Sequence, residues 1–378
     1  MTPTNLTALL STALFLLIGT AVTAASSTER TVNCGDTITS DTTLDRDLRD
    51  CPNNGIVIGA DGVTLNLNGH TIDGDGRPFE ECGRREPCDV GVFNDRHDDV
   101  TVRGGSTRGF GVGILIGGAR ANRILSVLST SNVFFGFVIA DSSRSVIRGS
   151  AGSGNPVPEG DGLGVFASHH LRIVGNEFRR NALGMHIEGS TDILVRRNRM
   201  TGNSDFGLLM EADRNVVRGN RTARNGSAIG VGHGSRNVIA ANRSVRDGEG
   251  IWVERGRGNV FVRNVVIGTR YSGIRLGIVK PSIGSVGTLV RGNVVRAAGR
   301  HGFEVNPRDR HSRLIGNTAR RARRDGFHIA SRSARLTGNR AFHNADLGFE
   351  AVPGVIDAGG NSAHNNGDAR QCTYVWCW

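Results

Sequence analysis

Apolar and polar residues alternate in short runs along most of this chain, and the runs recur at a regular interval. Many of the runs begin at a glycine, as in Gly184-Met-His-Ile-Glu188, Gly250-Ile-Trp-Val-Glu254 and Gly326-Phe-His-Ile-Ala330. Alternation with a period of two is the pattern of a β-strand that buries one face. The first and third residues after each glycine are therefore predicted to point inward, and the second and fourth outward.

Asparagine marks the interval between the runs. Asn176, Asn198, Asn220, Asn242 and Asn264 are separated by 22 residues each, and the series continues at Asn293, Asn317, Asn339 and Asn361. The two longer intervals, after Asn264 and after Asn293, place insertions of seven and two residues. A repeat of this length indicates a solenoid, in which each unit packs on its neighbours.

Three short strands and their turns fit into one such unit, which is one coil of a parallel β-helix. We therefore predict an all-β fold of about a dozen coils of about 22 residues, with apolar side chains in a narrow lumen. Asparagine side chains at a turn can hydrogen-bond from coil to coil, which satisfies their amides without water. Helical repeats lack this period-two pattern, and the leucine pattern of leucine-rich repeats is absent.

Two motifs then carry a family resemblance. The run Leu65-Asn-Leu-Asn-Gly-His-Thr-Ile-Asp-Gly74 and the Gly-Asn pairs from Gly175-Asn176 to Gly360-Asn361 resemble the right-handed parallel β-helix proteins of the pectate-lyase-like superfamily. That superfamily includes polysaccharide lyases, glycoside hydrolases, uronate epimerases, NosD-type copper-binding accessory proteins and exported proteins without known activity. The resemblance implies a right-handed β-helix over residues 61–366, and it leaves the activity open because a fold does not fix a function.

The two ends of the chain differ from the repeat. Residues 1–25 carry no charged side chain and contain an apolar run that ends at small residues, which predicts a cleaved signal peptide and a secreted or cell-envelope protein without a transmembrane segment. Residues 26–60 and 367–378 are predicted to cap the solenoid. Six cysteines form three sequence-local pairs, and three disulfides are expected in an oxidising compartment. The expected partners are Cys34 with Cys51, Cys82 with Cys88, and Cys372 with Cys377.

The formal net charge is +11, and Lys280 is the only lysine among the basic residues. A basic exported protein favours polyanions, so a polysaccharide or other polyanion is the expected partner of a monomeric protein, and nucleic acid is not expected. The alternative is that the arginine bias reflects a GC-rich genome and that the arginines only form a solvated surface.

Counting from the glycines places charged and aromatic residues on one outward face. The second position gives Phe166, His186, Leu209, Gly232, Trp252, Arg275, Glu304, His328 and Glu350, and the fourth position includes Glu188, Glu211 and Glu254. Such a strip suits an extended polymer. The alternative is a ladder of cross-strand ion pairs that only supports the sheet.

If the strip is catalytic, we expect Glu254, Arg275, Glu304 and His328 to carry the chemistry. Arg275 would bind a uronate carboxylate, His328 or Glu304 would be the base, and Glu254 its partner, in a lyase, epimerase or hydrolase. The expected substrate-binding residues are Trp252, His186, Glu188, Glu211 and His301. The rival hypotheses are a non-catalytic surface or structural protein and, behind it, a copper-binding accessory protein.

No resident metal or cofactor is predicted. Weaker signals for copper are His169-His170 and the acidic run Asp95 to Asp99, and Asp73-Gly-Asp75 resembles part of a calcium turn. A surface or turn role is the alternative at each place.

Overall fold

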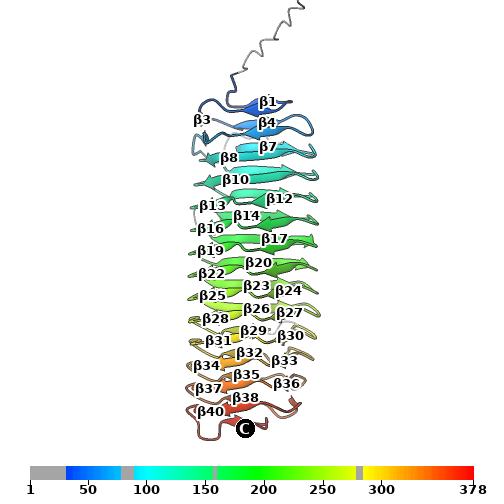
Figure 1. The fold of residues 1–378 in the computed structure, drawn as a ribbon, viewed down its shortest axis with the longest axis vertical. Coiled ribbons are helices and arrows are strands. Elements are labelled where there is room, and N and C mark those ends of the chain that lie inside the picture. The colour runs from blue at the N-terminus through cyan, green and yellow to red at the C-terminus, as the bar shows by residue number, and fades with distance from the viewer. Residues whose placement is uncertain (1–30, 78–88, 156–159, 278–283) are drawn as a thin grey trace, which may run out of the picture. The chain divides into compact units, whose positions relative to one another are not determined.

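The computed structural model describes residues 31–77, 89–155, 160–277 and 284–378. The predicted signal peptide 1–25 and Lys280 lie outside the described residues. Residues Val32–Trp378 form one compact unit. In that unit the described chain is all β-strand and turn, and each strand pairs in parallel with its counterpart in the next coil (Figure 1).

One long sheet contains 15 strands in chain order, one from each coil (Figure 1). We call it sheet A. Its strands are β1 (Asp36–Ile38), β4 (Ile56–Ile58), β7 (Val90–Asp95), β9 (Val112–Gly117), β11 (Phe135–Ala140), β14 (Asp161–Phe166), β17 (Leu183–Thr191), β20 (Phe206–Asp213), β23 (Ser227–His233), β26 (Glu249–Arg255), β29 (Ile274–Leu276), β32 (Phe303–Val305), β35 (Phe327–Ile329), β38 (Phe349–Ala351) and β41 (Cys372–Thr373).

The remaining strands complete each coil as two further ladders, which share β8 and β10. The first ladder contains β2 (Thr42–Thr43), β5 (Thr64–Asn66), β8 (Thr101–Arg108), β10 (Arg123–Thr130), β12 (Val146–Arg148), β15 (Arg172–Val174), β18 (Leu194–Arg196), β21 (Val216–Arg218), β24 (Val238–Ala240), β27 (Val260–Val262), β30 (Leu289–Arg291), β33 (Arg313–Ile315), β36 (Arg335–Thr337) and β39 (Ile356–Asp357). The second contains β3 (Leu48–Cys51), β6 (Thr71–Gly74), β13 (Ala151–Ser153), β16 (Glu177–Arg179), β19 (Arg199–Thr201), β22 (Arg221–Ala223), β25 (Arg243–Val245), β28 (Val265–Ile267), β31 (Val294–Arg296), β34 (Thr318–Arg320), β37 (Arg340–Phe342) and β40 (Ser362–His364).

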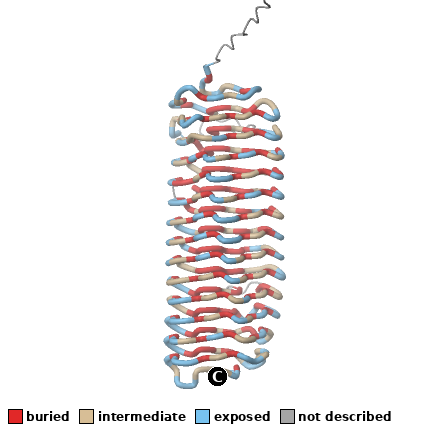
Figure 2. The backbone as a smooth tube through the Cα atoms, viewed as in Figure 1, coloured by how far each residue is buried: buried red, intermediate tan, exposed pale blue. Residues whose placement is uncertain are grey.

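Buried residues recur from coil to coil (Figure 2), and the apolar ones form one core cluster that fills the lumen. Residues of equivalent position stack on one another, and the rings of Phe303, Phe327 and Phe349 lie 4.6 Å apart in succession. The alternation seen in the sequence thus has its expected cause, because inward residues of all three ladders share this one lumen. The predicted all-β solenoid is confirmed.

The asparagine series forms the predicted ladder inside the coils. All nine asparagines are buried, and the side-chain amide of each of the first eight donates to the side-chain oxygen of the next, as from Asn198 to Asn220 at 3.1 Å. A second ladder, which the sequence did not reveal, runs through Asn181, Asn203 and Asn225 to Asp247. These ladders satisfy the backbone at two turns of the coil.

Two of the three predicted disulfides are present in the described residues. Cys34 is bonded to Cys51, and Cys372 is bonded to Cys377. Cys82 and Cys88 both lie outside the described residues. The disulfide expected between Cys82 and Cys88 therefore stays a prediction.

Strands extend into both segments predicted as caps. β1 and β3 belong to the first coil, and the first disulfide joins the segment before β1 to β3; at the other end the second disulfide follows β38. Sheet A therefore has more strands than the predicted dozen coils. The additional strands lie in the segments predicted as caps, residues 26–60 and 367–378, whose sequences lack the regular Gly-Asn spacing. None of the described residues belongs to a helix that could span a membrane.

The strand register corrects two members of the predicted outward strip. Gly164 is the register partner of His186, so Gly164 and not Phe166 belongs to the second position. Gly230 is the register partner of Leu209 and Trp252, so Gly230 and not Gly232 belongs to it. Phe166 instead lies opposite Glu188, at the fourth position. The count failed because those two coils enter sheet A at Gly162 and Ala228 and carry a second glycine inside the strand.

Candidate functional site

Three rows of side chains run side by side across sheet A between β26 and β38. The first row is the confirmed series Trp252, Arg275, Glu304, His328 and Glu350, which are successive register partners. The second row contains the residues that precede the turn glycines, and the third contains the residues one position earlier. The second row is Glu249, Ser272, His301 and Asp325, and the third includes Tyr271, Arg300 and Arg324.

The second row was largely missed from the sequence because the glycine interrupts the alternation. A Cβ at Gly250 would overlap the carbonyl oxygen of Gly273, so only glycine fits where the chain turns into the sheet. Glu249 and Trp252 consequently reach the same outer face although they are three positions apart. The available signal was a polar residue directly before the turn glycine, as in Glu249-Gly250 and Asp325-Gly326.

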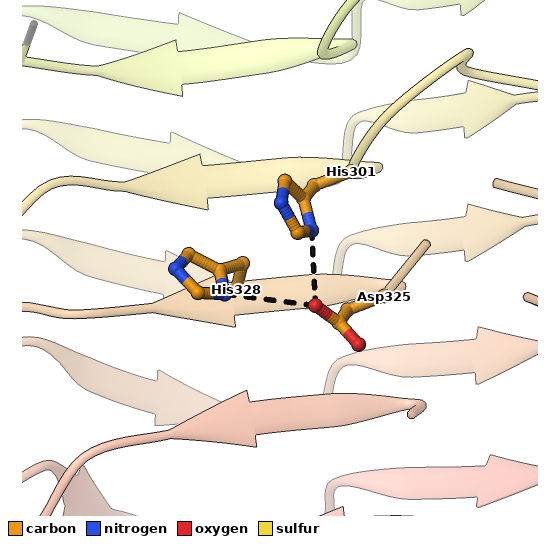
Figure 3. A group of neighbouring side chains, drawn as sticks. All are labelled: His301, Asp325 and His328. Atoms are coloured by element: carbon orange, nitrogen blue, oxygen red, sulfur yellow. Dashed lines mark ion pairs between the residues drawn. The ribbon is translucent and has the colours of Figure 1, made fainter. Parts of the chain in front are cut away.

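Two histidines converge on one carboxylate oxygen (Figure 3). Asp325 Oδ2 lies 3.0 Å from His301 Nδ1 and 3.5 Å from His328 Nδ1, while its other oxygen accepts the Leu347 amide at 3.1 Å. The two rings stack with their centroids 4.5 Å apart. His301 and Asp325 are almost fully buried, whereas the His328 side chain is 33% exposed and also contacts Glu350. We call His301, Asp325 and His328 the His–Asp cluster.

The contacts of this cluster perturb its ionisation. Burial acts to raise the pKa of Asp325, but His301 and then His328 outweigh it, so that the pKa lies far below its usual value. The interaction with Asp325 raises the pKa of His328; burial opposes this change, and Glu350 adds to it. The His328 imidazole is partly exposed, and the Asp325 carboxylate holds one of its nitrogens. Such an arrangement can transfer protons.

Arginines and glutamates occupy the adjacent part of the face. Arg275 Nη1 lies 3.4 Å from Glu249 Oε1, and its guanidinium lies 5.9 Å from the Trp252 ring centre. Burial raises the pKa of Glu249, while Arg275 acts against that rise. Glu304 accepts a hydrogen bond from Ser272 and lies 4.0 Å from Arg300 Nη2. The Nε atoms of Arg275 and Arg300 are both buried without a hydrogen-bond partner.

Two residues of the predicted site are less accessible than expected. Trp252 is 8% exposed because Phe206 and Arg275 pack on it, and Glu304 is 3% exposed. An aromatic surface is instead offered by Tyr271, which is 45% exposed and lies under the Arg270 guanidinium. No pattern in the sequence favoured Tyr271, because its position before the turn glycine falls outside the period-two count.

The structure separates the remaining predicted residues. Glu254 lies at the fourth position and pairs with Arg255 at 3.6 Å, and it makes no ion pair with the other predicted catalytic residues. His186, Glu188 and Glu211 lie on β17 and β20, nearer the N-terminus, away from the His–Asp cluster. Only His301 of the predicted binding residues belongs to that cluster.

Hollows in the described surface occur near the carboxyl end of β32. Two of them share Pro307 and Arg310, and Arg257 and Arg308 line one of the two. The arginines make the rim of these hollows basic.

Two groups of described residues have the spacing of metal ligands. One is the His–Asp cluster, and the other is His186, Glu188 and Glu211. The weaker metal candidates of the sequence are in neither group. Asp73 lies in β6, and its carboxylate pairs with Arg108 at 2.7 Å.

Comparisons with known proteins match this geometry to a fold. The A-module of Azotobacter vinelandii mannuronan C-5 epimerase AlgE6 superposes with a TM-score of 0.57 at 16% identity, covering 87% of this chain and 88% of that chain. The tailspike protein of E. coli bacteriophage HK620 superposes with a TM-score of 0.67 at 11% sequence identity, covering 90% of this chain and 69% of that chain. The chain is a parallel β-helix protein. The periplasmic alginate epimerase AlgG gives a TM-score of 0.52 at 13% identity, covering 71% and 74%.

One family model also matches part of this β-helix protein. It is described as periplasmic copper-binding protein (NosD), and it covers residues 153–280, about a third of the chain. No curated protein sequence matches significantly.

Copper is the metal that this partial match implies, and the described side chains fit only one of its oxidation states. Copper(I) prefers sulfur ligands. The described cysteines are all in disulfides, and Met185, Met200 and Met210 are buried in the lumen. Copper(II) accepts imidazole and carboxylate ligands, which both ligand-like groups of the outer face provide.

Proposed function

We propose that this protein is exported, binds uronate-containing polysaccharide on the outer face of β26 to β38, and removes the proton α to a uronate carboxylate. The observation that carries this proposal is the half-exposed His328 held by the buried Asp325. A fixed imidazole beside a row of arginines combines the base and the cations that this chemistry requires.

The cations account for the choice of an acidic substrate. The Arg300 side chain is 41% exposed, and the Arg275 side chain, one coil before it, is 18% exposed. A guanidinium can bind a carboxylate through two parallel hydrogen bonds. Arg300 and Arg275 therefore bind the uronate carboxylate and stabilise the negative charge that develops on it. Tyr271 offers the exposed ring for stacking on a sugar.

The reaction follows from these positions. His328 takes the proton from C-5, and the electron pair of the broken C–H bond moves into the carboxylate group. Return of a proton to the opposite side of C-5 gives the epimer. Expulsion of the glycosidic oxygen at C-4, with a proton delivered to that oxygen, gives the unsaturated sugar of a lyase. Glu254 lies on β26, three strands from His328 on β35, so we assign it no step in this proton transfer.

Other features support this choice over glycoside hydrolysis. A hydrolase needs two accessible carboxyl groups on either side of the bond, and Glu304 is buried against Ser272. Glu304 serves instead to orient Arg300. Among the proteins of this fold, mannuronan and alginate epimerases act on uronate polymers. The two described disulfides agree with export, because disulfides persist in oxidising compartments.

The test is turnover of a uronate polymer such as polymannuronate by the purified protein. Ultraviolet absorbance detects an unsaturated product, and proton NMR detects an epimer. His328→Gln is expected to lower kcat at least ~100-fold, and Arg275→Ala to raise KM and lower kcat. His343→Gln is the matched control, because His343 lies in the turn after β37, outside sheet A. If the wild type binds the polymer without turnover, the protein is a non-catalytic binding protein. If His328→Gln turns over the polymer as fast as the wild type, His328 is not the base.

A further inference from the structure

Two glutamates face each other on neighbouring strands of sheet A, away from the His–Asp cluster. Glu188 on β17 and Glu211 on β20 are register partners. Like charges directly opposite on adjacent strands destabilise a sheet. Several acidic residues of the described surface have an arginine partner, but Glu188 has no ion pair with any described residue, and Glu211 has only histidines near it. The pair therefore lacks a fixed positive charge.

The ligand atoms of this group lie close together on the outer face of sheet A. A ring nitrogen of His186 and one carboxylate oxygen from each glutamate lie within 4.8 Å of one another. His186 Nε2 is 3.9 Å from Glu211 Oε2, and His233 Nδ1 is 3.6 Å from Glu211 Oε1, both too long for hydrogen bonds. Metal–ligand bonds of roughly 2.1 Å place two ligand atoms roughly 3 to 4.2 Å apart, depending on the angle at the ion.

The surroundings hold these groups in position without satisfying them. His186 Nε2 is buried and has no hydrogen-bond partner, and the Phe166 ring packs edge-on against the imidazole with a centroid distance of 5.6 Å. A Cβ at Gly232, on the next strand, would approach Glu211 Oε1 to 2.9 Å. The glycine thus leaves room for the Glu211 carboxylate to reach a ligand on the outer face.

We infer that His186, Glu188 and Glu211 bind one divalent transition-metal ion of the zinc or copper(II) class, with His233 adjacent as a further donor. Imidazole and carboxylate together suit these ions, whereas calcium takes oxygen ligands alone. The ion neutralises the two opposed glutamates. The site lies within residues 153–280, which match the copper-binding family model, and it is independent of the proposed polysaccharide chemistry.

The His–Asp cluster is the competing location, and its contacts differ. There the carboxylate of Asp325 already pairs with both imidazoles, at 3.0 and 3.5 Å, so that opposite charges compensate one another. In the glutamate group the acids face each other, and the nearest imidazoles remain beyond hydrogen-bond distance. We therefore place the cation at the glutamate group and not at the His–Asp cluster.

The experiment is calorimetric titration of the chelator-treated full-length protein with zinc chloride, and separately with copper(II) chloride. We expect one equivalent to bind to the wild type and calcium chloride to give no binding. Glu211→Gln and His186→Gln should each weaken binding at least ~10-fold, because each removes a ligand. Asp325→Asn and the surface variant His170→Gln should bind as tightly as the wild type.

Electron paramagnetic resonance of the copper(II) complex provides a second readout that does not depend on enzymatic activity. Nitrogen coupling in the wild-type spectrum should weaken in His186→Gln and persist in Asp325→Asn. Thermal denaturation of each metal-free variant verifies that it is folded. Absence of stoichiometric binding by the wild type, undiminished binding by the Glu211 and His186 variants, or loss of binding in Asp325→Asn would each overturn the assignment.

Discussion

Asp325 shows at the scale of one residue how a buried side chain determines the behaviour of an accessible one. It accepts the Leu347 amide with one oxygen and contacts His301 and His328 with the other. The backbone contact fixes the carboxylate, and the carboxylate fixes the His328 ring. The sequence predicted His328 but not Asp325, because the strand pattern gives no information about the residue before a turn glycine.

The ionisation of His328 leads to a prediction about the pH dependence of turnover. Asp325, and to a lesser extent Glu350, raise the pKa of His328 above the ordinary value of 6.5. A base acts in its deprotonated form, so wild-type turnover should rise with pH through a limb above that value. Glu350→Gln removes one of the two carboxylates, and the limb should move to lower pH in a kcat/KM profile. A limb that stays in place or moves upward would contradict the assignment of His328 as base.

Asp161 provides a prediction about stability at the same scale. Burial raises its pKa to about 7 from 3.8, against the opposing effect of the hydrogen bond from the Leu183 amide. Since the folded-state pKa is raised, the native state holds the proton more tightly, and the free energy of unfolding falls as pH rises from about 4 to about 7. Asp161→Asn keeps the acceptor oxygen and removes the charge.

We expect Asp161→Asn to be more stable than the wild type by about 1–2 kcal/mol near pH 8, with the difference disappearing below about pH 4. Chemical denaturation at both pH values measures it. Equal stabilities at the higher pH would show that Asp161 is not under strain from burial.

At the scale of the element, the turn glycines decide where sheet A begins in each coil. Gly250 has no room for a Cβ, whereas Gly219, in a turn of another ladder, has a φ of +66° and no heavy atom within 4 Å of a Cβ. Both are glycines of the same repeat, but the first is required by packing, whereas the second only eases a left-handed backbone conformation that Ala241 adopts at the equivalent place with a φ of +51°. The pair allows these two causes to be separated.

Gly250→Ala is expected to lower the free energy of unfolding by about 3 kcal/mol or more, the upper part of the range for overpacking, because the contact is with backbone. Gly219→Ala should cost about 1 kcal/mol for the left-handed conformation. Denaturant titration of both variants gives the comparison. A smaller loss for Gly250→Ala than for Gly219→Ala would show that the coil can shift to accept the methyl group.

The strands and coils could be predicted because their determinants are local and repeated. Period-two alternation identified the inward residues, and the asparagine spacing identified the coil length. The predicted register was wrong only in two coils. In one, Gly162 and Gly164 both offered a starting point for the count; in the other, Ala228 replaces the turn glycine. The burial of Trp252 and Glu304 could not be predicted, because it depends on Phe206 and Ser272 from other coils.

At the scale of the described solenoid, sheet A carries the two proposed sites on separate coils. The glutamate group lies on β17 and β20, and the His–Asp cluster lies at β32 and β35. Arg275, on β29, lies between these two groups. Each coil contacts mainly its neighbours, so substitutions at one site should leave the other folded. This separation is what allows metal binding and polysaccharide chemistry to be tested independently.

The central claim is that His328 removes the proton at C-5 of a uronate residue. Incubation with oligomannuronate in heavy water, followed by NMR and mass spectrometry, tests it most directly, because an epimerase places solvent deuterium at C-5 and a lyase leaves an unsaturated product from which the C-5 hydrogen is missing. We expect one of these outcomes for the wild type and for His343→Gln, and neither for His328→Gln. Retention of the original C-5 hydrogen in every sugar treated with the wild type would contradict the account.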